Sequence, residues 1–436
     1  MPFSPCPDPQ SGHSPALPWR RTRVFVTLVI IWVLQGCGFR SQPQGQPDRI
    51  PPQPPRVDSP RPEPPGSSLT TPQSAETPPA PPLQALADLN QPYDVLDEFG
   101  RSQFQVTSAQ VFERSGLPNL SVTFSEQDLL TVLRNTRAYF LTYAPQDPKI
   151  LRPGLLGAQG IEAADILNTL NFMIAVLQED LAAGRVTRLK DPQFLQQHFQ
   201  ILHWTPFNPG DQQQQELRLT KYAVFTHSGS RRPGAPYDVA LYQLEPQAKA
   251  DQVHRRYSKQ EVLAGVFEPG GVDHGQVKPL AYLTRTGLEE ALLQGTLLVN
   301  FVEGGSAYFN VDVNNGIAYE PGVAQQAQRR YWYFKQVDAI KGYGYTSEAK
   351  ISVLPGVTFA GDILNIGLGR VVALETQVEG KATLQLGLIA DTGGAFSPNL
   401  HQLDFLAGVF PSRAAFTDYA RSRSGQARAY ILVRPQ

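Results

Sequence analysis

Leu384-Gln-Leu-Gly-Leu-Ile-Ala-Asp-Thr-Gly-Gly-Ala395 begins as an apolar, β-rich run and ends in a Gly-Gly turn. Short β-rich runs of the same kind recur at residues 217–225, 297–302, 307–311, 331–334, 371–375 and 429–433. Gly, Asn or Pro separates most of these runs, as turns separate strands. A series of short strands with turn signals predicts a mainly β fold built on β-barrels rather than on a parallel α/β sheet.

Two segments ahead of these runs, residues 128–140 and 161–183, carry apolar residues at helical spacing. The stripe of the second segment consists of Leu167, Leu170, Ile174, Leu177 and Leu181. Gly184 follows as a natural helix stop. Because such a stripe usually faces a core, residues 96–210 are predicted to form a helical N-terminal subregion.

The N-terminal region has the pattern of an export signal. A cluster of arginines between positions 20 and 23 precedes an apolar run of 11 residues, 24–34. This run is well short of the roughly 20 apolar residues that a membrane-spanning helix needs. Leu34-Gln-Gly-Cys37 resembles the lipobox of bacterial lipoproteins, which implies removal of residues 1–36 and a lipid on Cys37. An uncleaved anchor is the alternative.

The composition limits the chemistry of the mature chain. The sequence contains two cysteines. Cys6 lies upstream of the predicted cut, and the acylated Cys37 would be the one that remains. A disulfide, a cysteine nucleophile and a zinc–cysteine cluster are therefore not expected. The formal net charge of -1, with 18% charged residues, offers no basic surface for nucleic acid.

Residues 37–95 form a proline-rich segment, with runs such as Pro51-Pro-Gln-Pro-Pro55. Such a segment cannot bury enough apolar surface to offset its ordering entropy, so a solvated linker is predicted. Together with the lipid, it indicates a cell-envelope protein that is anchored to a membrane and folded away from it. Gly38 after the lipid-bearing cysteine favours the periplasmic face of the outer membrane.

The motifs of metal and nucleotide chemistry are missing from the sequence. The seven histidines are scattered, without His-Glu-x-x-His, and neither a Gly-rich phosphate loop after a strand nor Gly-x-Ser-x-Gly occurs. We expect no metal and no cofactor. What remains is carboxylate chemistry near the C-terminus, at Asp362, Asp391 and Asp404. Taken singly, each of these aspartates is more often a turn former.

Taken in order, the three aspartates resemble the three-aspartate domain of the membrane-bound lytic murein transglycosylase A family. Asp362 stands before Ile366-Gly-Leu-Gly369, where the family has Ile-Pro-Leu-Gly. Asp391 opens an Asp-x-Gly-Gly-Ala turn, and Asp404 begins an Asp-hydrophobic-aromatic strand.

The resemblance continues upstream to about Leu217. The matching motifs, in chain order, are Leu219-Thr-Lys-Tyr222, Leu280-Ala-Tyr282, Gln294-Gly-Thr296, Asn315-Gly-Ile-Ala-Tyr319 and Leu354-Pro-Gly356. An ordered set of this length is far more specific than any single motif.

The resemblance implies a double-psi β-barrel formed by residues 211–245 and 328–436. A smaller β-domain, residues 246–327, would be inserted between the two parts, and a peptidoglycan glycan strand would lie in the groove that separates the domains. In the family the third aspartate is the acid/base, and this role carries over to Asp404.

The remaining roles are implied in the same way. Asp391 and Asp362 would be supporting carboxylates of the catalytic site. Gln294, Thr296 and Thr220 match polar positions of the family's groove and would bind the sugars.

The activity implied is cleavage of the bond between N-acetylmuramic acid and N-acetylglucosamine, which leaves 1,6-anhydromuramic ends. The sequence departs from the family near the site, because Gly393-Gly-Ala-Phe-Ser-Pro398 stands where the family has Gly-Gly-Ala-Ile-Lys-Gly. A misplacement of about 1 Å can cost about a hundredfold in rate. The alternative is therefore a non-catalytic murein-binding or scaffolding lipoprotein that keeps the groove.

Overall fold

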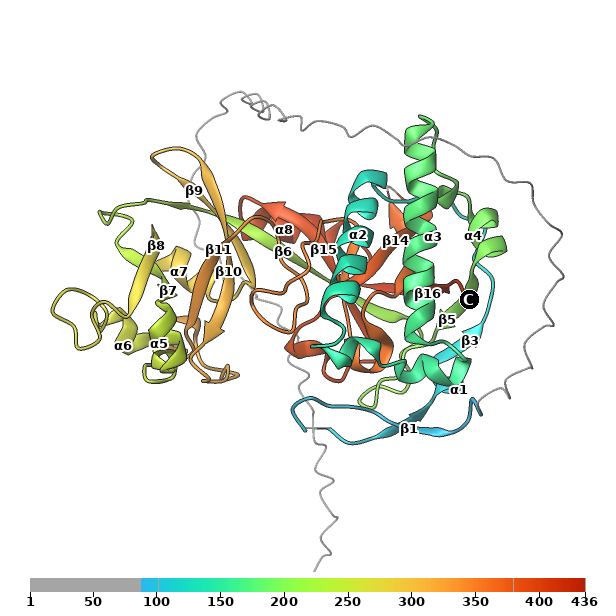
Figure 1. Ribbon diagram of the computed structural model, residues 1–436, viewed down its shortest axis with the longest axis horizontal. Helices are drawn as coiled ribbons and strands as arrows, with labels where there is room; N and C mark the ends of the chain where they lie inside the picture. The colour runs from blue at the N-terminus through green and yellow to red at the C-terminus, as the bar shows by residue number, and fades with distance from the viewer. Residues whose placement is uncertain (1–87, 101, 379, 436) are drawn as a thin grey trace, which may run out of the picture. The chain divides into compact units, whose positions relative to one another are not determined.

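The computed structural model describes residues 88–100, 102–378 and 380–435 (Figure 1). The predicted signal segment, the lipidation site Cys37 and most of the proline-rich linker lie outside these residues. The described part of the chain is mainly β, and its largest sheet has 12 strands.

Six strands of this sheet pair in a closed ring. They are β6 (Leu217–Gly229), β15 (Gln402–Phe410), β12 (Thr358–Ala360), β14 (Lys381–Asp391), β13 (Val371–Val378) and β16 (Gln426–Val433). Each strand pairs with the next in that order, and β16 pairs back to β6. Leu384, Leu386 and Leu388 of β14 are fully buried, and so are Ile389 and Ala390, so the second half of this strand is covered on both faces.

Two long helices cover part of this ring. They are α2 (Glu126–Tyr143) and α3 (Ala163–Ala182), which pack against each other and contact β14 and β16 respectively. The Ser125 side chain accepts from the Asp128 N–H at the start of α2. Gly184, with φ +64°, follows the end of α3. Both helices predicted from the sequence are therefore confirmed.

A second group of elements has its own hydrophobic core, which runs from Ala240 to Phe334. It contains the paired strands β7 (Val239–Leu244) and β8 (Val277–Leu283), and it also contains β9 (Thr296–Phe301), β10 (Ser306–Asn314), β11 (Trp332–Val337) and α7 (Arg285–Ala291). The long strand β6 belongs to both groups. Its first part pairs with β15 and β16, and residues 226–229 pair with β9. In Figure 1, β6 extends from the ring strands to β9 and β10.

Shorter elements complete the described chain. The strands are β1 (Pro92–Asp94), β2 (Gln105–Thr107), β3 (Phe112–Arg114), β4 (Val122–Thr123) and β5 (Gln200–Trp204). The helices are α1 (Ser108–Val111), α4 (Pro192–His198), α5 (Pro246–Ala250), α6 (Lys259–Leu263) and α8 (Arg413–Arg421).

Among the described residues, no single helix combines the length and the hydropathy that crossing a membrane requires. The segments Pro148–Gln159 and Ala163–Ala182 meet that test only together, across a bend of 95°.

A tight contact fixes the turn that follows β12. Gly154 has φ +59°, and a Cβ atom there would lie 2.3 Å from the Asn365 carbonyl oxygen. Gly160 has φ +74°, and a Cβ atom there would lie in open space. An alanine at either position would meet the cost of a left-handed backbone conformation. An alanine at Gly154 would also clash with the Asn365 backbone, so comparing the two substitutions isolates the cost of that clash.

We expect Gly160→Ala to lower the free energy of unfolding by about 1 kcal/mol, the cost of placing an L side chain in the left-handed region. Gly154→Ala adds a clash with backbone and is expected to cost about 3 kcal/mol in total. Urea unfolding of both variants measures the difference. Equal losses would mean that Gly154 does not support the turn.

Candidate active site

Four residues on neighbouring strands form one row across the ring. Asp404 of β15 is the register partner of Thr220 on β6 and of Ala360 on β12. Ala360 is also the register partner of Asp391 at the end of β14. A single strand, β12, therefore lies between the strands that carry the two aspartates. Neighbouring strands lie about 4.8 Å apart. The structure thus brings Thr220, Asp404 and Asp391 together.

The carboxyl group of Asp404 lies in a poorly solvated place. The residue is half-buried, and its Oδ1 atom is fully buried without a hydrogen-bond partner among the described residues. Burial, together with the nearby charge of Asp391, raises the pKa of Asp404 to about 7. Thr220 and the charge of Lys221 oppose this rise only in part. An ionised carboxylate with an unpaired buried oxygen is costly, so the protonated form is favoured.

Asp391 is the second carboxyl group of the row. Its Oδ2 accepts from the Tyr222 hydroxyl at 2.8 Å, and its Oδ1 accepts from the Thr392 N–H at 2.8 Å. Burial raises the pKa of Asp391 to about 6, although both hydrogen bonds and the charge of Lys350 lower it. Since hydrogen bonds to the charged form favour ionisation, Asp391 loses its proton before Asp404 does.

Lys350 connects the row to the second core. Its ammonium donates to the Asn310 Oδ1 at 2.5 Å and to the Val311 carbonyl at 3.2 Å, and both of these residues belong to β10. Burial lowers the pKa of Lys350, and the charge of Asp391 opposes that change. The lysine therefore lies between β10 and the Asp391 end of the ring.

Asp362 has a different environment from the other two aspartates. It is fully buried, and it accepts from the backbone N–H groups of Leu364, Asn365 and Asn399 at 2.9 to 3.1 Å. The Asn365 side-chain amide donates to it at 2.8 Å as well. Burial raises the pKa of Asp362, while these bonds lower it. The carboxyl group thus joins the turn after β12 to the segment that leads into β15.

The predicted sugar-binding residues differ in exposure. Gln294 and Thr296 are buried. The Gln294 side chain accepts from the Phe225 N–H at 2.9 Å, and the Thr296 hydroxyl accepts from the Asn310 side chain at 2.9 Å. Thr220 is half-buried, and its hydroxyl accepts from the Gln402 side chain at 2.9 Å. Of these three predicted residues, Thr220 is the one in the row with Asp404.

Tyr222 and Lys350 were not among the predicted site residues. Tyr222 could have been found, because it lies two positions after Thr220 on one strand and so points to the same face. Burial and the charge of Asp391 raise its pKa well above the ordinary value, so it remains a neutral hydrogen-bond donor. Lys350 lies in the irregular segment between β11 and β12, where no periodicity indicates its direction.

The row combines an acid that is protonated near neutrality with a more readily ionised neighbour. A general acid works best when its pKa lies near the operating pH. Two carboxyl groups whose environments separate their pKa values are typical of catalytic acid/base pairs. The arrangement of Asp404 and Asp391 is thus suited to donating and recovering one proton.

The fold is similar to that of the lytic murein transglycosylases. The membrane-bound lytic murein transglycosylase from Agrobacterium tumefaciens matches with a TM-score of 0.50 and 16% identity, over 74% of this chain and 98% of that chain. MltA from E. coli with bound chitohexaose gives a TM-score of 0.49 at 17% identity, over 74% and 94% of the two chains. MltA from Neisseria gonorrhoeae gives 0.46 at 13% identity, over 74% and 97%.

No protein-family model and no curated protein matches the chain. The resemblance to the lytic murein transglycosylase A family, inferred above from short motifs, is confirmed at the level of the fold by the Agrobacterium structure.

The raised pKa of Asp404 predicts a pH-dependent cost in stability. Unfolded aspartate has a pKa of about 3.9, so between about pH 4 and pH 7 the folded chain keeps a proton that the unfolded chain has lost. The free energy of unfolding therefore falls as the pH rises from about 4 to about 7, and the loss is complete above pH 7. We expect Asp404→Asn to raise the free energy of unfolding by about 1 to 2 kcal/mol at pH 8, an estimate reduced for partial exposure, and to change it little at pH 4.

Urea unfolding at pH 4, 6 and 8 measures this effect. Asp418→Asn is the matched control, because that side chain is 78% exposed. A gain for Asp404→Asn that is the same at all three pH values would contradict the raised pKa.

Proposed function

We propose that this protein is a lytic transglycosylase that cleaves peptidoglycan glycan strands, with Asp404 as the single acid/base. The observation that carries the proposal is the half-buried Asp404 carboxyl, with a pKa of about 7, on a fold similar to that of a lytic murein transglycosylase. A scaffold that only binds murein has no need of a carboxyl group whose pKa lies near neutral pH.

One carboxyl group is sufficient for this reaction. Asp404 gives its proton to the oxygen of the glycosidic bond between N-acetylmuramic acid and N-acetylglucosamine, and the bond from that oxygen to the muramyl C1 breaks. The Asp404 carboxylate then takes the proton of the muramyl 6-hydroxyl, whose oxygen bonds to C1 and closes the 1,6-anhydro ring.

The 6-hydroxyl is already tethered to the reacting sugar. Ordinary glycosidases use a second carboxylate to attack the sugar or to activate water. Intramolecular attack replaces that group, because effective concentrations for tethered nucleophiles are on the order of 10⁵ M or more. Asp391 therefore need not act as a nucleophile.

We assign supporting parts to the other predicted residues. Burial is the main cause of the raised pKa of Asp404, and the charge of ionised Asp391 raises it further, while Asp362 holds the turn beside the row. Thr220 contacts the sugar next to Asp404. Gln294 and Thr296, whose side chains have internal partners, shape the wall of the groove on the side of the second core.

We propose that the ring of six strands is the double-psi β-barrel, and that residues 246–327 belong to the inserted domain, whose core also takes in β7 and β11. Lipidation at Cys37 and the proline-rich linker would anchor the protein to the outer membrane and let the folded part reach murein from the periplasmic face.

Digestion of purified sacculi tests the proposal. We expect the wild-type protein to release 1,6-anhydromuropeptides, identified by mass spectrometry. Asp404→Asn is expected to lower the rate about a hundredfold or more, since loss of a general acid costs at least that factor, while co-sedimentation with sacculi persists.

Asp418→Asn serves as the charge-matched control and is expected to retain activity. If wild-type protein binds sacculi and releases no anhydro products, the non-catalytic scaffold is the correct function. If it neither binds nor cleaves them, both assignments are wrong.

A further inference from the structure

A recess of about 20 Å³ lies on the opposite face of the β6–β15 pair from Asp404. Successive side chains of a strand point to opposite faces. Lys221 and Phe405, which are register partners, line this recess, whereas Thr220 and Asp404 precede them on the two strands. The other residues that line the recess are Leu219, Leu374, Thr376, Gln377, Gln385, Arg423 and Ser424.

The charges in the recess are both positive. Lys221 and Arg423 are cations, and none of the described residues that line the recess carries a carboxylate. The Lys221 ammonium donates to the Leu219 carbonyl at 3.0 Å and to the Ser424 carbonyl, which fixes its position. Burial lowers the pKa of Lys221, the charge of Asp404 opposes that change, and the charge of Arg423 adds to it. Two like charges are thus held near each other, both on half-buried side chains.

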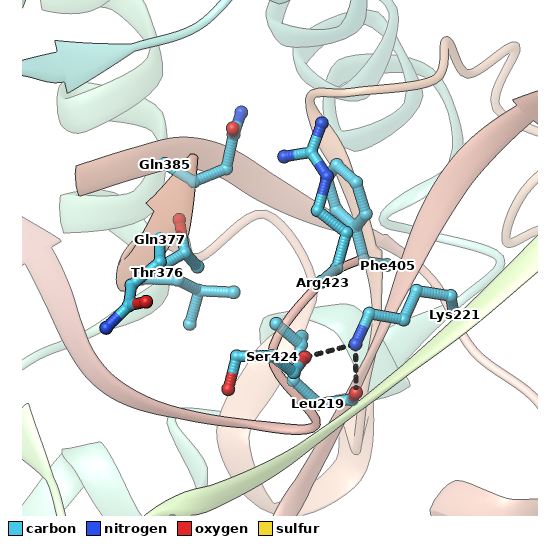
Figure 2. Close-up of a pocket in the computed structure, with 9 residues that line it drawn as sticks. Leu219, Lys221, Thr376, Gln377, Gln385, Phe405, Arg423 and Ser424 are labelled. Carbon is cyan, nitrogen blue, oxygen red and sulfur yellow. Dashed lines mark hydrogen bonds between the residues drawn. The ribbon is translucent and has the colours of Figure 1, made fainter. Parts of the chain in front are cut away.

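The Arg423 guanidinium has N–H donors that are available to a ligand. Figure 2 shows the Lys221 ammonium turned toward Leu219 and Ser424, while no hydrogen bond joins the Arg423 guanidinium to another residue drawn there. The contact found for this guanidinium among the described residues is with the Tyr419 ring, 5.1 Å from the ring centroid. A guanidinium presents five N–H donors in a fork that matches a carboxylate or a phosphate.

The recess opens beside a larger polar pocket of about 550 Å³. The two share Thr376, Gln377, Arg423 and Ser424. A volume of this size is within the range of small-molecule sites, roughly 300 to 1,000 Å³. The smaller recess is large enough for about one water-sized group, such as one oxygen of an anion.

The other charged residues of the larger pocket already have partners. The Arg428 guanidinium lies 3.7 Å from a Glu216 carboxylate oxygen and 3.9 Å from one of Glu375. Arg421 lies 3.6 Å from Asp418. Arg423 is therefore the cation of this region that has no carboxylate partner among the described residues, while Lys221 is also acted on by the charge of Asp404.

We propose that Arg423 and Lys221, with the polar side chains around them, form a binding site for an oxyanion, a carboxylate or phosphate group carried by a small polar ligand. The site goes beyond the proposed cleavage reaction, because it lies across the β6–β15 pair from Asp404 and needs no glycan. An oxyanion would accept from the free guanidinium donors and offset the repulsion between the two cations. The larger pocket would hold the rest of the ligand.

Isothermal titration calorimetry of the full-length protein at low ionic strength tests this site. The probes are succinate for a carboxylate source, inorganic phosphate for a phosphate source, and the neutral isostere succinamide. We expect saturable binding of at least one anion and none of succinamide. Arg423→Gln is expected to weaken binding about tenfold or more, the loss typical of a charge-assisted hydrogen bond, and Arg423→Lys is expected to weaken it less.

The matched control is Arg114→Gln, which removes one exposed positive charge on β3, outside both pockets. Lys221→Gln is the second variant, and thermal unfolding midpoints close to that of the wild type establish that all variants are folded. Preference for succinate or for phosphate identifies the source of the oxyanion. Absence of binding, equal binding of succinamide, or equal affinity in Arg423→Gln and Arg114→Gln overturns the proposal.

Discussion

The parallel pairing of β6 with β15 is the contact on which both candidate sites depend. It joins distant parts of the chain, since the Gln402 side chain donates to Thr220 at 2.9 Å across 182 sequence positions. On one face this pairing sets Thr220 beside Asp404, and on the other it sets Lys221 beside Phe405. A shift of register by one residue would exchange the two faces, so Asp404 would lie in the recess and lose its place in the row with Asp391.

The environment of the two aspartates explains how similar side chains acquire different behaviour. Asp391 has two hydrogen bonds to its carboxylate and the charge of Lys350 nearby. Asp404 has a buried oxygen without a hydrogen-bond partner in the part of the chain that the structure describes, and it has a negative neighbour. Desolvation is the leading cause of both raised pKa values, and the hydrogen bonds decide which group ionises first. A fold that separates two carboxyl groups in this way can keep one proton available near neutrality.

Much of the ring could be predicted from the sequence, because β6, β13, β14 and β16 are apolar, β-favouring runs bounded by turns. Strand β12 could not, since three residues are too few for a periodic pattern. The adjacency of Thr220 and Asp404 was expected from a family resemblance, not from spacing. The position of Lys350 depends on how an irregular segment packs against β10, and the internal bonds of Gln294 and Thr296 depend on tertiary packing that no local pattern encodes.

The central claim is that a large fraction of Asp404 is protonated at neutral pH, and the pKa of that carboxyl group is the most direct test of it. Carbon-13 NMR titration of protein labelled at the aspartate carboxyl carbon, with Asp404→Asn used to assign the resonance, measures this value. The account predicts a midpoint near 7. A midpoint near 4, the ordinary value for a solvated aspartate, would show that the carboxyl is ionised at neutral pH and cannot serve as the acid.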